Sequence, residues 1–134
     1  MGLCSVAIML DWDCKSKIIL NQSIIAELLK DGPKCDHKKI AAKIAKLYLD
    51  QIEHIYLPIL KNQHWILVVV NSLNEIVELY DSLFVVVEGQ HPHKDLWDNL
   101  AANLREAYCI ARRKSVYIDS FYCKYPPNRI QTII

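Results

Sequence analysis

Two short apolar runs separated by a polar break form the strongest pattern in the chain. The runs are His64–Val70 and Glu75–Asp81, and the break is Asn71-Ser72-Leu73-Asn74. Runs rich in Val and Ile on either side of such a break are typical of a β-hairpin. A loop centred on the break would place His64 directly opposite Asp81, with apolar residues paired on the same face. The pattern therefore predicts an imidazole beside a carboxylate at the end of a buried hairpin.

Helical periodicity marks two segments before the hairpin. Asn21 is a good N-cap for a short helix through Leu29, and Asp31-Gly32-Pro33 would stop it. Asp36 would cap a second helix that reaches about Gln51. The outer side of that helix carries a basic stripe of Lys39, Lys43 and Lys46. A solvated helix face is the ordinary interpretation of this stripe, and a site for an acidic partner is the alternative.

The segments after the hairpin complete the expected fold. Residues 94–113 predict a longer helix with an apolar stripe of Trp97, Leu100, Ala101, Leu104, Tyr108 and Ala111. We expect a short strand at 115–119, continued at 121–125. Residues 1–17 have no clear period, and both an edge strand and a remnant of a longer upstream region are open for them. Together these elements predict an α/β (α+β) fold. A mixed or antiparallel sheet centred on the hairpin would have helices packed against it, in one domain spanning 1–134.

Composition narrows the function classes. Sixteen Lys and Arg against fifteen Asp and Glu leave a net charge of +1, so we expect no nucleic-acid partner. No apolar run reaches the roughly 18 residues of a membrane span, so we expect no membrane partner. The five cysteines are irregularly spaced without a CxxC pair. That spacing argues against a disulfide framework or zinc site and favours a reduced, intracellular protein. His91-Pro92-His93 has no third ligand nearby, so we expect neither a metal nor another cofactor.

The predicted His64–Asp81 pair has two interpretations. An aspartate beside a histidine fixes the ring tautomer and stabilises the imidazolium, which are the orienter and base of a nucleophilic triad. A structural His–Asp pair at a strand end is the alternative, because ion pairs of this kind are often structural. The chemistry of the two residues alone leaves both open.

Longer motifs around the pair bear a family resemblance. His64-Trp65-Ile66-Leu67 and Tyr80-Asp81-Ser82-Leu83 resemble the catalytic hairpin of the ubiquitin-like-protein-specific (SUMO-type) cysteine proteases. Residues 55–59 look like the strand before that family's histidine, and the resemblance is strongest over 20–127. It implies a papain-like cysteine-peptidase fold and a thiol protease that processes a ubiquitin-like modifier, with deSUMOylation as one such activity. It also implies His64 as general base, Asp81 as its orienter, and a ubiquitin-like modifier or its conjugate as partner. An intracellular location is implied as well, with the nucleus as one compartment open to it.

The family's nucleophile is the part of the resemblance that we do not find. In the family an Asp-Cys-Gly motif follows a final strand and a Pro-containing turn. Residues 122–127 are similar to that approach, but no Asp-Cys-Gly follows. Gln131 lies near where the oxyanion glutamine would fall, among neighbours that do not match, and neither Cys109 nor Cys123 is assigned a catalytic role. We therefore expect a partial protease domain, incomplete at its C-terminus and inactive as written, with part of its apolar surface uncovered.

Two alternatives to a peptidase stay open. One is a non-catalytic binding module for a ubiquitin-like protein, and the other is a truncated fragment derived from a mobile element. The sequence identifies neither the modifier nor the oligomeric state.

Overall fold

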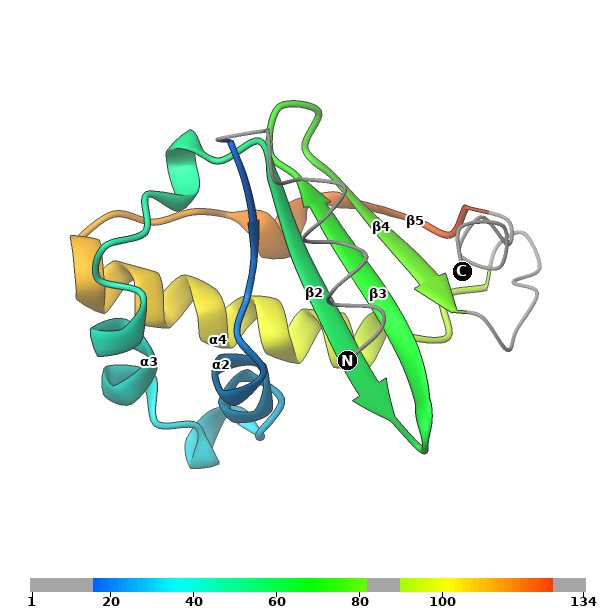
Figure 1. The fold of residues 1–134 in the computed structure, drawn as a ribbon, viewed down its shortest axis with the longest axis horizontal. Coiled ribbons are helices and arrows are strands. Elements are labelled where there is room, and N and C mark those ends of the chain that lie inside the picture. The colour runs from blue at the N-terminus through cyan, green and yellow to red at the C-terminus, as the bar shows by residue number, and fades with distance from the viewer. Residues whose placement is uncertain (1–15, 82–89, 127–134) are drawn as a thin grey trace.

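A mixed five-stranded sheet with helices on one side organises the chain (Figure 1). The computed structural model describes residues 16–81 and 90–126. The strands, in sheet order, are β1 (Lys17–Ile19), β2 (His54–Lys61), β3 (His64–Asn71), β4 (Ile76–Asp81) and β5 (Tyr122–Lys124). The three central strands are antiparallel, while β1 and β5 run parallel to their neighbours. The predicted α+β architecture with a central hairpin is therefore confirmed, and Lys17 begins an edge strand.

Two of the predicted helices form close to their expected bounds. Helix α2 (Gln22–Leu28) begins after Asn21, whose side chain accepts a hydrogen bond from the backbone N of Ser23 at 2.7 Å. Helix α4 (Lys94–Arg112) crosses the sheet and ends at Arg113, which has a left-handed φ of 54°. Such caps satisfy backbone groups that a helix end leaves without intrahelical partners.

The core lies between the sheet and these helices. Burial alternates along β4 and along part of β2 and β3, where Pro58 and Val69 are buried as well. Trp97 and Tyr108 of α4 are fully buried against these strands. The fully buried strand residues are Ile55, Leu57, Ile59, Ile66, Val68, Val70, Val77 and Leu79. The predicted stripe of α4 therefore faces the sheet.

Two of the predicted elements are wrong. The second helix ends much earlier than Gln51: α3 (His37–Lys43) is followed by a turn and the 3₁₀ helix η2 (Leu49–Gln51). Ile44 and Leu49 are still buried, because the turn after α3 places both side chains in the core without a continued helix. The expected strand at 115–119 does not form: residues 115–117 have no regular secondary structure and lead into the 3₁₀ helix η3 (Ile118–Ser120), which buries Ile118. A third short 3₁₀ helix, η1 (Gly32–Lys34), follows α2.

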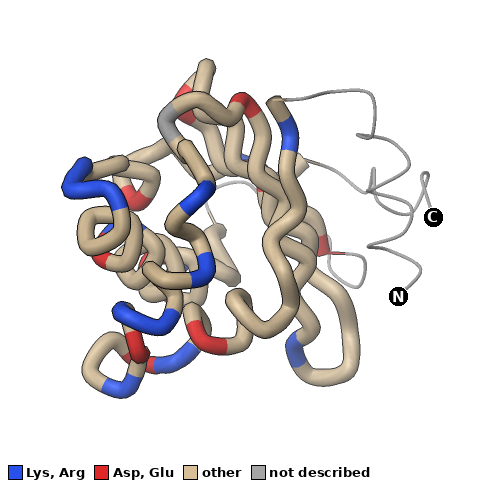
Figure 2. Tube along the Cα trace, turned by 60° about the vertical axis from the view of Figure 1, so that its left-hand side comes forward, with Lys and Arg blue, Asp and Glu red and all other residues tan. Residues whose placement is uncertain are grey.

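The basic stripe is partly tied to the neighbouring helix. Figure 2 shows that Lys and Arg positions gather on the helices, with few along the sheet. Lys39 lies 3.8 Å from a carboxylate oxygen of Glu27, and Nζ of Lys43 donates to Oγ of Ser23. These contacts agree with a solvated helix face that also joins α3 to α2.

The hairpin has the predicted strands but a different register. Asp81 pairs with Ile66 rather than with His64, and Asn71 pairs with Ile76. The cause is a four-residue turn at 72–75, in which the Asn71 side chain accepts from the backbone N of Asn74 and Glu75 has a φ of 55°. Because side chains alternate with a period of two, this two-residue shift keeps every side chain on its predicted face.

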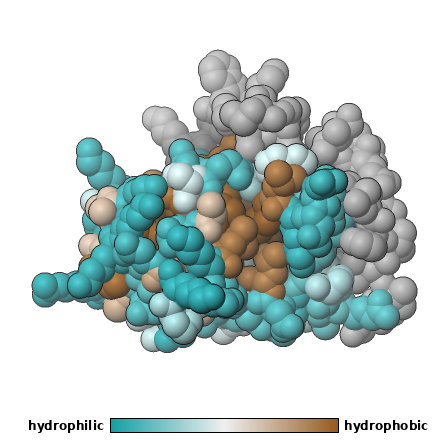
Figure 3. Space-filling model, turned by 90° about the horizontal axis from the view of Figure 1, so that it is seen from below, coloured by the Kyte–Doolittle hydropathy of each residue, from teal (hydrophilic) through white to brown (hydrophobic). Residues whose placement is uncertain are grey.

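Apolar surface gathers on the lower face of the molecule. Figure 3 shows a hollow there with apolar residues in it and polar residues around it. The effect of this apolar surface on association stays a prediction.

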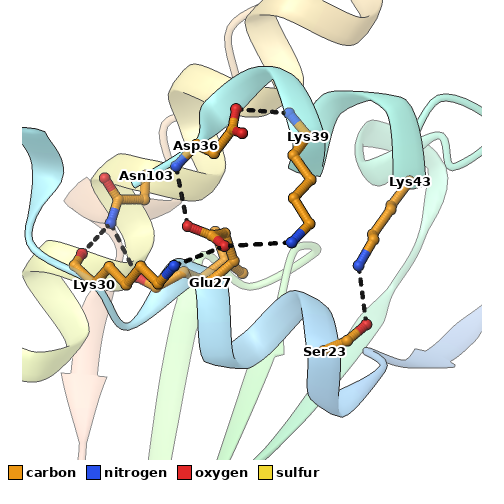
Figure 4. Close-up of polar contacts among 8 residues, drawn as sticks. Ser23, Glu27, Lys30, Asp36, Lys39, Lys43 and Asn103 are labelled. Carbon is orange, nitrogen blue, oxygen red and sulfur yellow. Dashed lines mark hydrogen bonds and ion pairs between the residues drawn. The ribbon is translucent and has the colours of Figure 1, made fainter. Parts of the chain in front are cut away.

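A buried carboxylate joins α2 to α3 (Figure 4). Glu27 is only 6% exposed and accepts hydrogen bonds from the backbone N of Asp36 and from Nζ of Lys30. These hydrogen bonds, that from Asp36 first, hold the pKa of Glu27 below its usual value. Nδ2 of Asn103, on α4, donates to the backbone oxygens of Leu28 and Lys30 at 2.9 Å each. Two buried polar side chains thus fix the C-terminal end of α2.

Candidate active site

His64 and Asp81 lie at the same end of the sheet because of strand direction. His64 is the first residue of β3 and Asp81 is the last residue of β4. These strands are antiparallel, so the start of one lies beside the end of the other. The hairpin alternation that buries Ile66 also directs His64 and Asp81 to the core side.

The two side chains meet, as the sequence predicts. Nε2 of His64 lies 3.3 Å from Oδ2 of Asp81, with side-chain exposed fractions of 12% and 1%. They are diagonal rather than direct neighbours, because Ile66 is the residue paired with Asp81. Diagonal positions on one face are within reach of long side chains. The prediction that the pair shares one face of adjacent strands is therefore confirmed, although the predicted register is not.

A third residue, His93, completes the cluster and was not predicted as part of it. Nε2 of His93 lies 2.7 Å from Oδ2 of Asp81, and its side chain is 5% exposed. His93 is the N-cap residue of α4, but its side chain does not cap the helix. One feature of the sequence could have indicated His93: it lies at the start of the predicted helix that follows the Asp81 strand. His91-Pro92-His93 was considered only as a metal pair.

The two histidines of that motif lie in different environments. His91 is exposed, and its ring centroid is 5.5 Å from that of Tyr125. His93 turns instead to the buried carboxylate. Within residues 16–81 and 90–126, no group of three or more His, Cys, Asp and Glu residues is arranged to hold a metal ion.

The geometry suits one task of acid–base chemistry. Nε2 of His64 faces Asp81, so Nδ1 is the ring nitrogen that would act as the base. A ring held this way can take a proton at Nδ1 while the carboxylate stabilises the resulting imidazolium. The pair can therefore act as a general base with its orienter.

The three cysteines of the described residues lie away from this base. Cys123 pairs with Val77 on β4, about 13 Å along the strand from Asp81. Cys109 is exposed and lies about 22 Å along α4 from the start of that helix. Cys35 is buried beside Glu27 and Asp36, and burial raises the pKa of its thiol, as it does for Cys123. A raised thiol pKa is the opposite of what an activated nucleophile has. Of the expected nucleophile approach at 122–127, residues 122–126 are described and include β5, whereas Pro127 and Gln131 lie outside the described residues.

Comparison with known proteins assigns the family. A sequence model of the Ulp1 protease family, C-terminal catalytic domain, matches residues 13–134. The chain belongs to the Ulp1 protease family. A comparison with curated proteins gives no match.

Solved structures of SUMO proteases share the fold. A de-sumoylating protease superposes with a TM-score of 0.64 at 12% identity, covering 92% of this chain and 48% of that chain. The C-terminal Ulp1 protease domain in complex with Smt3, the yeast ortholog of SUMO, gives a TM-score of 0.61 at 16% identity. That match covers 92% of this chain and 53% of that chain. Ulp1 with its catalytic cysteine oxidised to a sulfinic acid gives a TM-score of 0.60 at 15% identity, covering 91% of this chain and 52% of that chain.

These matches bear on the fold and its extent. The predicted protease fold is confirmed, and this Ulp1-family chain spans about half the length of the solved structures that it matches. Among the helices of the described residues, none has the length and apolar character needed to cross a membrane.

Proposed function

We propose that this chain carries the base half of a cysteine-peptidase site that acts on ubiquitin-like modifiers. His64 is the general base, and Asp81 holds its ring and stabilises its charged form. The observation that carries the proposal is the 3.3 Å contact between Nε2 of His64 and Oδ2 of Asp81 at the end of the Ulp1-family hairpin.

A ubiquitin-like modifier is the proposed partner. The support is family membership, together with the similarity in fold to a Ulp1 domain in complex with Smt3. Proteases of such modifiers act inside cells, so we propose an intracellular location, with the nucleus as one compartment.

We also propose that the 134-residue chain does not cleave modifiers by itself. A thioester needs a thiolate within reach of the base, and Cys35, Cys109 and Cys123 are all poorly placed for that. Because members of a triad act as a unit, a base that no cysteine of the described residues serves gives little of the full rate. A binding module that holds a modifier without cleaving it is the second candidate. The retained fold over 92% of the chain favours it.

Two measurements on the full chain test these proposals. The first is cleavage of a panel of modifier-fused reporters, with covalent labelling by a modifier that bears a cysteine-reactive C-terminus. The second is binding of the unmodified modifiers, followed by calorimetry. We expect the chain to bind at least one modifier without cleaving it, and we expect the His64→Ala variant to bind that modifier with the same affinity. Absence of binding to every modifier would overturn the proposed partner. Cleavage or labelling that disappears in His64→Ala would overturn the proposed inactivity.

A further inference from the structure

His93 forms the shortest contact of the cluster. Its Nε2 lies 2.7 Å from Oδ2 of Asp81, against 3.3 Å for Nε2 of His64. We propose that His93 is a positioning residue for the His64–Asp81 pair. As a neutral imidazole it donates from Nε2 to Oδ2 and holds the carboxylate in place without neutralising it. This inference rests on the proposed function, because it assigns His64 as the base that Asp81 serves.

The surroundings of His93 indicate which of its two ring nitrogens carries a proton. Nδ1 of His93 is buried and has no hydrogen-bond partner within the part of the chain that the structure describes. In an imidazolium both ring nitrogens carry protons, so the charged form would bury an unpaired N–H. Burying an unpaired donor on a charged group is costly. The neutral form with its proton on Nε2 avoids this cost and supplies the donor that Oδ2 accepts.

A neutral donor suits the shared oxygen. Oδ2 of Asp81 has lone pairs for both rings, and the two Nε2 atoms approach that one atom. A charged His93 would offset the carboxylate and repel a charged His64. A neutral His93 leaves the full negative charge of Asp81 for the imidazolium that forms at His64.

The location of His93 explains how it can hold the carboxylate firmly. N-cap positions usually carry side chains that accept from the first helical N–H groups, as Asn21 does for α2. The His93 side chain makes no such cap and turns to Asp81 instead. Helix α4 is anchored by the fully buried Trp97 one turn later. His93 therefore ties the end of β4 to a rigidly packed helix.

The test reads ring protonation by long-range ¹H–¹⁵N spectra of the full chain at neutral pH. Signals are assigned by single substitution of each histidine. We expect His93 to be one neutral tautomer, with Nε2 protonated and Nδ1 bare. In His93→Leu, which has no donor, the Asp81 carboxylate is no longer held in place for His64. The ratio of Nε2–H to Nδ1–H forms of His64 should then fall by about tenfold, as expected if its charge-assisted hydrogen bond to Asp81 is lost. In His93→Gln, whose amide N–H can reach the same oxygen, the ratio should stay within about twofold of wild type.

Controls separate positioning from folding and from the proposed function. His91→Leu, two residues away at an exposed position, should leave the His64 ratio unchanged. The wild-type tautomer of His93 needs no variant, so it is informative even if His93→Leu does not fold. A doubly protonated His93, a proton on its Nδ1, or an unchanged His64 ratio in a folded His93→Leu would each overturn the inference. The spectra require no modifier. Loss of modifier binding with these spectra as expected would therefore overturn the proposed partner and leave the positioning role standing.

Discussion

Oδ2 of Asp81 lies 2.7 Å from Nε2 of His93 and 3.3 Å from Nε2 of His64. One carboxylate oxygen thus joins β3, β4 and the start of α4. The Asp81 side chain is 1% exposed, so little water competes for these contacts. The arrangement makes Asp81 the residue on which the cluster depends.

Asp81→Asn should therefore destabilise the chain strongly. The amide keeps the shape of the carboxylate but loses its charge, and one buried imidazole N–H would face a weaker acceptor or another donor. We expect a loss of about 2–4 kcal/mol in the free energy of unfolding, measured by urea denaturation. Asp98→Asn is the matched control, because Asp98 pairs with Lys94 on the exposed side of α4. That pair should contribute about 0.3–0.5 kcal/mol. Equal losses for the two variants would show that Asp81 is not a buried anchor.

The sequence predicted the pair but not the third member. Alternation along the strands was sufficient to put His64 and Asp81 on one face, since face depends only on a period of two. Their relative register was wrong because it depends on turn length, and a four-residue turn with a left-handed Glu75 gives no clear sequence signal. His93 was missed because α4 brings it back to the sheet through tertiary packing, which local periodicity does not encode.

The fold shows the same division between local and tertiary information. The Asn21 cap and the apolar stripe of α4 are local patterns, and both elements formed where predicted. The early end of α3 is different, because Ile44 and Leu49 satisfy the core from a turning path. Apolar residues at helical spacing between Asp36 and Gln51 therefore do not require one continuous helix there.

Asn103 should be more important to stability than its neighbour Asn99. Its side chain is 2% exposed and donates to the oxygen of Leu28, the last residue of α2, and to that of Lys30, two residues beyond the helix. Asn103→Ala should cost about 2–4 kcal/mol in the free energy of unfolding. Asn99→Ala, which removes one more exposed bond to the Lys30 oxygen, should cost under about 1 kcal/mol. A larger loss for Asn99→Ala would contradict this account of the α2 terminus.

Glu27 should make stability depend on pH in acid. Its pKa in the folded chain lies below the ordinary value of 4.5, chiefly because the backbone N of Asp36 donates to the carboxylate. A lowered folded-state pKa gives a contribution that is complete above the unfolded value and is lost as pH falls through the folded one. The difference in unfolding free energy between wild type and Glu27→Gln should therefore be constant above about pH 5 and shrink below 4.5.

Denaturant unfolding at a series of pH values measures that difference. Glu75→Gln is the control, because Glu75 is exposed in the hairpin turn and makes no comparable set of bonds in the described structure. Glu75→Gln thus controls for removing a carboxylate charge elsewhere on the chain. A Glu27→Gln difference that stays constant down to pH 3 would contradict the lowered pKa.

The cysteines should react with a small alkylating reagent according to burial and without regard to His64. Among the three cysteines of the described residues, Cys109 is exposed on α4 and should react first, whereas burial raises the pKa of the Cys35 and Cys123 thiols and should make both slow. Mass spectrometry of digested, time-sampled reactions gives a rate for each peptide separately. Because none of the three lies near the His64 ring, His64→Ala should change each rate by less than about twofold. His91→Ala is the control for a histidine substitution at the same end of the fold. A large drop in the Cys109 or Cys123 rate in His64→Ala alone would mean that His64 activates that thiol. The chain would then contain a working base–nucleophile pair that the described structure does not bring together.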